Sequence, residues 1–93
     1  MKTIWKFNLP ISNYCTIQIP KNYKILKVAE QKNEITLWAQ VDDCKDTEDV
    51  TFRIVGTGQP LGDKQLKYLD SVSLYDGYLV FHVYKIFKCK VIK

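Results

Sequence analysis

The chain has 93 residues, of which 46% are hydrophobic and 26% are charged, with a formal net charge of +4. This length supports one hydrophobic core, and the composition excludes a disordered chain, which would hold too few apolar residues to fold. No apolar run approaches the roughly 20 residues of a membrane helix, and the N-terminal MKTIWKFNLP is too polar for a signal peptide, so we expect a single cytoplasmic domain over residues 1–93.

The first half of the chain contains segments with the character of β-strands. Apolar and polar residues alternate, as in a strand with one buried face. The first two segments stop at Pro10 and Pro20, a third covers residues 25–31, and Lys32-Asn33 before the fourth predicts a hairpin. The alternating apolar residues are Trp5, Phe7 and Leu9, then Cys15, Ile17 and Ile19, then Ile35, Leu37, Ala39 and Val41.

The second half continues the pattern. Val50, Phe52 and Ile54 alternate with polar residues up to the glycine-rich residues 56–60, which break regular structure. Residues 66–74 predict a sixth strand, Asp76-Gly77 predicts a hairpin turn, and Leu79, Phe81 and Val83 predict a seventh strand. No segment has a sustained helical period. We therefore predict an all-β fold, a meander closed into a single small sandwich or barrel of about seven mostly antiparallel strands.

Charged residues and cysteines are unevenly placed. Residues 42–49 form an acidic loop with five acids and one base, while residues 85–93 are rich in lysine. The terminal segment either extends the last strand or pairs as an exposed edge with a second subunit, so we expect a homo-oligomer. The spacing of the cysteines fits neither a disulfide framework nor a zinc knuckle, and we expect free thiols at Cys15, Cys44 and Cys89.

Four segments together resemble a family of small uncharacterised proteins encoded by phages and prophages. They are TIWKF at 3–7, LWAQVD at 37–42, TFRIVGTGQP at 51–60 and LVFHV at 79–83. The resemblance covers about residues 1–84, and it departs at Gln59, where the family usually has histidine. It implies a shared fold and a location in the cytoplasm of a phage-infected host cell, but no chemistry.

Strand phase also predicts a ligand-binding face. Side chains of opposite phase to the core face solvent, and Arg53 there suits a two-pronged contact with phosphate. Trp38 or Tyr84 offers a stacking face for a base, and the glycine loop offers backbone N–H groups to an anion. The candidate ligand-binding residues are Trp38, Arg53, Gly56, Thr57, Gly58, Gln59, His82 and Tyr84.

Each candidate also has a structural interpretation. Trp38 would pack beneath the acidic loop or a second sheet, Arg53 would pair with a surface acid, and His82 would pack across strands. The Gly-Thr-Gly loop lacks the Lys-Ser and helix of a P-loop. With His82 as the sole histidine, no catalytic triad or histidine-based zinc site can be assembled, so we expect neither an enzyme nor a bound metal or cofactor.

Two functional hypotheses follow. The first is a small phage protein, acting in counter-defence, that sequesters a nucleotide-like or other anionic ligand. The alternative is a protein-interaction module that docks onto a host or phage protein through an exposed strand edge and residues 42–49 or 85–93. Nucleic-acid binding is not expected, because a charge of +4 with clustered acids gives a shallow electrostatic footprint.

Overall fold

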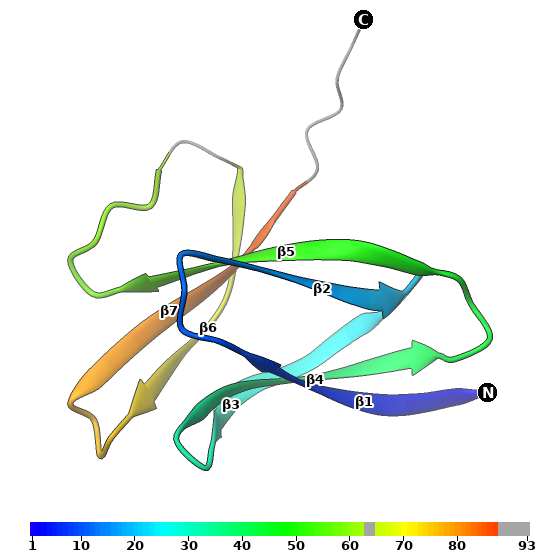
Figure 1. Cartoon of the computed structure of the whole chain (residues 1–93), viewed down its shortest axis with the longest axis horizontal. Coiled ribbons are helices and arrows are strands. Elements are labelled where there is room, and N and C mark those ends of the chain that lie inside the picture. The colour runs from blue at the N-terminus through cyan, green and yellow to red at the C-terminus, as the bar shows by residue number, and fades with distance from the viewer. Residues whose placement is uncertain (63–64, 88–93) are drawn as a thin grey trace, which may run out of the picture.

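The computed structural model describes residues 1–62 and 65–87, and this part of the chain folds into seven β-strands (Figure 1). All seven strands lie where the sequence predicts them, so the all-β fold class is confirmed. The strands are β1 (Lys2–Leu9), β2 (Tyr14–Pro20), β3 (Lys24–Gln31), β4 (Glu34–Asp42), β5 (Thr47–Gly56), β6 (Leu66–Leu74) and β7 (Leu79–Ile86).

The strands form two antiparallel sheets. Within the described residues, one sheet has the order β1-β4-β3 and the other the order β2-β5-β7-β6. This arrangement is a small sandwich and not a closed barrel, which decides between the two predicted architectures. The predicted meander is wrong: β1 pairs with β4, β2 with β5 and β5 with β7, and direct hairpins join only β3 to β4 and β6 to β7 among these strands.

Both predicted hairpins are present. Lys32 and Asn33 have φ angles of 53° and 60°, so the turn between β3 and β4 has two left-handed central residues, as in type I′ turns that match the twist of paired strands. The β6–β7 turn carries Tyr75 and Asp76 in the same region. The Tyr75 N–H donates to Oδ1 of Asn33 at 2.9 Å, and the two hairpin tips lie at the same end of the molecule (Figure 1).

The core lies between the two sheets and consists largely of the predicted inward-facing residues. Ile35, Leu37 and Phe52 are at most 1% exposed. Burying an apolar side chain of this size stabilises the fold by about 1.5–3 kcal/mol. Trp5 shares their phase but remains 37% exposed, because β1 is an edge strand. Many of the buried core residues therefore come from β4 and β5, which lie inside their sheets.

The edges of the sandwich position the candidate site. The strands β3 and β6 are edges of different sheets, and they lie against each other.

The acidic segment 42–49 is partly strand. Because β4 ends at Asp42 and β5 begins at Thr47, the predicted loop is a shorter turn between these two strands. The last strand runs on to Ile86, and the terminal residues 88–93 lie outside the described residues.

The cysteine prediction is confirmed for the two described cysteines. Cys15 and Cys44 carry free thiols, and Cys89 lies outside the described residues. Burial raises the pKa of the Cys15 thiol, since the charged thiolate is disfavoured away from water. Cys15 thus serves as a small apolar residue of the core.

Candidate functional site

Three predicted site residues share the outer face of the β2-β5-β7-β6 sheet. Arg53 on β5 is the direct partner of Tyr84 on β7, and Val55 is the partner of His82. Directly opposed residues in an antiparallel pair point to the same side, so Arg53, Tyr84 and His82 all point away from the core. Strand phase predicts their outer face correctly, but the solvent exposure of the three side chains differs.

Arg53 is buried, and the prediction that it is exposed is wrong. Its side chain is 8% exposed because segments before β2 and after β5 supply acceptors around it. Its Nη1 donates to the carbonyls of Asn13 at 3.1 Å and Ile54 at 3.0 Å, and its Nη2 donates to the carbonyl of Pro60 at 2.9 Å. The guanidinium therefore organises two loops, and these N–H groups are not available for the phosphate contact expected from sequence.

Trp38 lies on the other sheet, so the structure does not bring it together with Arg53 and His82. It is half-buried on the outer face of β4, between its cross-strand partners Lys6 and Lys27. The Lys27 Nζ lies 5.9 Å from the centroid of the indole ring, within range of a cation–π contact. Trp38 therefore contacts the edge strand β3 and is not part of the predicted face.

The glycine loop uses its own polar groups to hold its shape. Gly58 has a φ of 92°, which favours glycine. The Gly56 N–H donates to Oε1 of Gln59 at 2.8 Å, and the Gln59 N–H donates to the Gly56 carbonyl at 3.1 Å. Because these two amides are paired, the expected anion nest is not formed by Gly56 and Gln59. Gln59 closes the turn.

A chain of polar contacts crosses the outer face through His82. Its Nε2 lies 2.8 Å from the Thr57 hydroxyl, and its Nδ1 lies 2.7 Å from the Ser71 hydroxyl. The Ser71 hydroxyl in turn lies 2.6 Å from that of Tyr68. Since a neutral imidazole donates from one nitrogen and accepts at the other, both hydroxyls satisfy the ring. Thr57 and His82 thus meet as predicted, and Ser71 and Tyr68 are additions that the sequence did not indicate.

The polar contacts around His82 are suited to holding the Tyr68 side chain in place. A serine 2.7 Å from an imidazole has the spacing of a nucleophile and base. In a catalytic triad, however, the other ring nitrogen faces a carboxylate, and here it faces the Thr57 hydroxyl. The contacts hold Tyr68, whose ring also packs edge-on against Tyr84 at 5.4 Å between centroids.

Tyr68 connects this face to a groove where β3 and β6 come together. The groove has a volume of about 500 Å³ and is lined by residues 23–28 and 67–70 and by Lys85. We refer to it as the lysine groove. Its described lining has four lysines and one acid, Asp70, and two aromatic residues. The charged and aromatic residues are Lys24, Lys27, Lys67, Lys85, Asp70, Tyr23 and Tyr68.

Irregular pairing shapes both walls of the lysine groove. The register of β3 shifts between Ile25 and Lys27, and the register of β6 shifts between Tyr68 and Asp70. Such bulges bend an edge strand and redirect its side chains. Both irregularities lie in segments that line the groove, so lysines of both walls border the same space.

Lys85 lies at the boundary between two cavities of opposite character. Its Nζ is 4.9 Å from the centroid of the Tyr23 ring. Lys85 and Tyr23 also line a neighbouring cavity of about 280 Å³, which contains Glu48 and Asp49. Among the described residues, the neighbouring cavity is therefore lined by two acids and one lysine, and the lysine groove by four lysines and one acid.

Sequence reasoning missed the lysine groove because its residues come from three strands of two sheets. The alternation assigns each strand a buried and an exposed face, but it does not say which edges meet. The signal that was available is the lysine content of residues 24–27, 67 and 85, which becomes a site only when β3 lies against β6.

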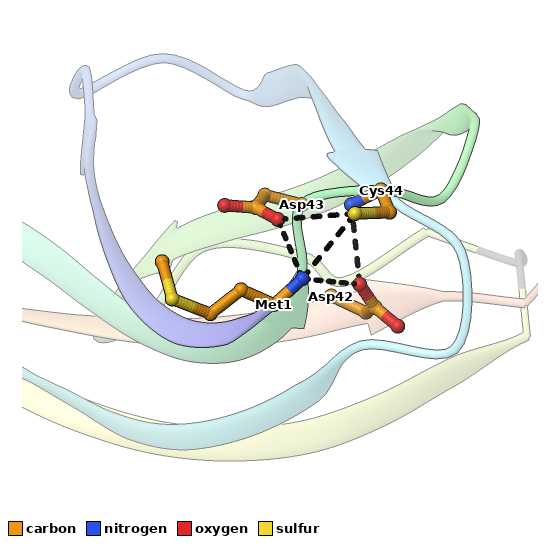
Figure 2. Close-up of polar contacts among 4 residues, drawn as sticks. All are labelled: Met1, Asp42, Asp43 and Cys44. Carbon is orange, nitrogen blue, oxygen red and sulfur yellow. Dashed lines mark hydrogen bonds and ion pairs between the residues drawn. The ribbon is translucent and has the colours of Figure 1, made fainter.

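The turn after β4 gathers acidic groups around the Met1 ammonium (Figure 2). This nitrogen donates to Oδ1 of Asp43 at 2.9 Å, to Oδ1 of Asp42 at 3.3 Å and to Sγ of Cys44 at 3.3 Å. These bonds, that to Asp43 first, raise the pKa of the ammonium to about 11. The Cys44 N–H and then the Met1 ammonium lower the pKa of Asp42. The three acceptors have ligand atoms within 4.8 Å of one another, and the ammonium already donates to each of them.

Comparison with known proteins places the chain in a family. A model of a domain of unknown function (DUF7352) matches residues 1–88, and the chain belongs to this uncharacterised family. No curated protein and no solved structure matches the chain. Residues 1–62 and 65–87 contain no helix that is long and apolar enough to cross a membrane.

Proposed function

We propose that this protein binds a nucleotide-like anionic ligand in the lysine groove and sequesters it. The observation that carries the proposal is the convergence of Lys24, Lys27, Lys67 and Lys85 around one groove in which the described lining offers Asp70 as its acid. Ammonium groups attract phosphate as point charges, and a partly enclosed groove strengthens that attraction relative to open solvent.

The two tyrosines of the groove supply the second element of nucleotide binding. Tyr68 is held by Ser71 and Tyr84, and Tyr23 is held by Lys85. Stacking of a base on an aromatic side chain contributes about 1–3 kcal/mol. Rings that are already held lose less conformational freedom on binding, which improves affinity.

Sequestration fits the setting that the sequence resemblance implies. A small phage-encoded protein in an infected cell would lower the free concentration of a nucleotide signal by binding it without altering it. The Ser71 hydroxyl, which contacts both His82 and Tyr68, supports binding because it orients Tyr68 beside the groove. Counter-defence and the phage setting are part of this proposal.

Isothermal titration calorimetry with ATP as the probe tests the proposed function. We expect binding that weakens as salt rises, because screening reduces the attraction between lysine and phosphate. Lys67→Met with Lys85→Met should weaken it by about tenfold or more. Lys45→Met is the matched control, because it removes one charge from the exposed β4–β5 turn. Unchanged affinity in the groove variant, or no heat with millimolar ATP, would contradict the proposal.

One observation favours docking to a protein as a second function. Tyr78 is 87% exposed in the β6–β7 turn, and Tyr75 and Ile11 are 50% and 53% exposed. Aromatic residues are enriched at the centres of protein interfaces. If this end of the sandwich is the functional surface, Tyr75→Ser with Tyr78→Ser should abolish co-purification of a protein partner and leave ATP binding unchanged.

A further inference from the structure

Lysines line the groove in two pairs that come from opposite walls. Lys24 and Lys27 belong to β3, whereas Lys67 and Lys85 belong to β6 and β7. The second pair is directly opposed across the strands, which places the Cβ atoms of such a pair about 4.5–5.5 Å apart. Because both side chains leave the sheet side by side, their two ammonium groups can reach and donate to the oxygens of one phosphate group.

We propose that the lysine groove selects a nucleotide with a chain of at least two phosphates, held between the β3 lysines and the Lys67–Lys85 pair. This inference rests on the proposed function and names its ligand class. One phosphate bridges Lys67 and Lys85, and a neighbouring phosphate of the same chain reaches Lys24 and draws the Lys27 ammonium away from the Trp38 ring, from whose centroid it lies 5.9 Å in the free protein.

The charge of the groove matches such a ligand. The described lining contributes four lysines and one aspartate, so its formal charge is 4 − 1 = +3. A monophosphate brings only about −1.5 to −2 charges near pH 7, and it leaves one lysine pair without a counter-charge. A di- or triphosphate neutralises both pairs, so each added phosphate is expected to increase affinity.

The residues next to the groove also limit the length of phosphate backbone that it can hold. Beyond Lys85 the neighbouring cavity carries Glu48 and Asp49, whose charges oppose the continued path of a phosphate backbone. Among the described residues, the lysines of the groove therefore end at Lys85 on this side. A short phosphate chain fits within these limits, whereas an extended strand would meet the carboxylates.

Calorimetry with AMP, ADP, ATP and inorganic triphosphate tests the inference. We expect ATP to bind about tenfold or more tightly than AMP, with ADP between them and triphosphate weaker than ATP because it lacks the base. Lys67→Met and, separately, Lys24→Met should reduce the ratio of ATP to AMP affinity. Lys45→Met, with the same change in net charge, should leave the ratio unchanged. Lys67→Gln provides a second variant at this position, and urea unfolding of each protein checks that it is folded.

Several results would overturn the inference in distinguishable ways. Equal affinity for AMP and ATP, with both weakened in Lys67→Met, would contradict selection by phosphate number and leave the proposed function standing. Tighter binding of a single-stranded oligothymidylate than of ATP would replace a nucleotide with a polymer as the ligand. Absence of binding to all of these probes at millimolar concentration would contradict the proposed function itself.

Discussion

Lys67 on β6 and Lys85 on β7 are direct cross-strand partners, so two lysine side chains leave the sheet side by side at one wall of the lysine groove. Like charges in this arrangement destabilise a sheet. An anion bound at the groove would place a negative charge beside both lysines.

The opposed lysines should therefore lower stability when no anion is present. We expect Lys67→Met to raise the free energy of unfolding by about 0.2–1 kcal/mol at low salt, because methionine keeps much of the apolar stem and removes the repulsion. Urea unfolding in a buffer without phosphate measures this change. Lys45→Met controls for net charge. A variant less stable than this control would show that Lys67 is stabilising in the free protein.

Arg53 should matter for folding and not for direct ligand contact. Replacing it by methionine leaves the carbonyls of Asn13, Ile54 and Pro60 without their charged donor, and we expect a loss on the order of 3 kcal/mol in unfolding free energy. Urea unfolding measures it. Tyr14→Leu removes the cation–π contact of Arg53, at 5.1 Å, and keeps its three hydrogen bonds to the carbonyls, so it should cost less. A stable Arg53→Met protein would mean that these bonds are not needed for the fold.

Tyr68 should contribute to binding through its ring more than through its hydroxyl. Tyr68→Phe keeps the ring and loses the contact with Ser71, so we expect a small loss of ATP affinity. Tyr68→Ala removes the stacking surface, and the loss should be about 1–3 kcal/mol. Calorimetry compares the two variants. Equal losses would indicate that the hydroxyl, and not stacking, carries the effect.

The Met1 ammonium gives a pH dependence with a defined sign. Its pKa rises from 8.0 to about 11 in the folded chain, so its stabilising contribution is full below pH 8 and disappears as pH rises toward about 11. Asp43→Asn should lower this pKa and expose more neutral amine. Acylation of the chain at mildly alkaline pH, read by peptide mass spectrometry, should then be faster at Met1 in the variant. Equal rates would contradict the role of Asp43.

Much of the fold follows from local sequence. Alternation identifies the strands because one face of each sheet is buried, and Ile35, Leu37 and Phe52 are buried as predicted. Turn residues identify both hairpins. Strand order does not follow, because pairing of β1 with β4 or β5 with β7 depends on contacts between segments far apart in the chain.

The candidate site was predictable only in part. Thr57, His82 and Tyr84 lie on the predicted face, and Thr57 contacts His82. Phase alone could not show that Arg53 is covered by its bonds to two loops, since phase gives direction and not accessibility. The lysine groove forms because β3 and β6 lie against each other, and the alternation of residues within a strand does not predict which strand edges meet.

An amide chemical-shift titration of the ¹⁵N-labelled protein with ATP tests most directly whether the lysine groove binds a nucleotide. We expect the largest shifts at residues 24–28, 67–70 and 85, which line the lysine groove, and we expect the Lys67→Met and Lys85→Met double variant to lose them. Shifts centred instead on the Tyr75–Tyr78 turn or on the Met1–Cys44 cluster, or no saturable shifts at all, would contradict it.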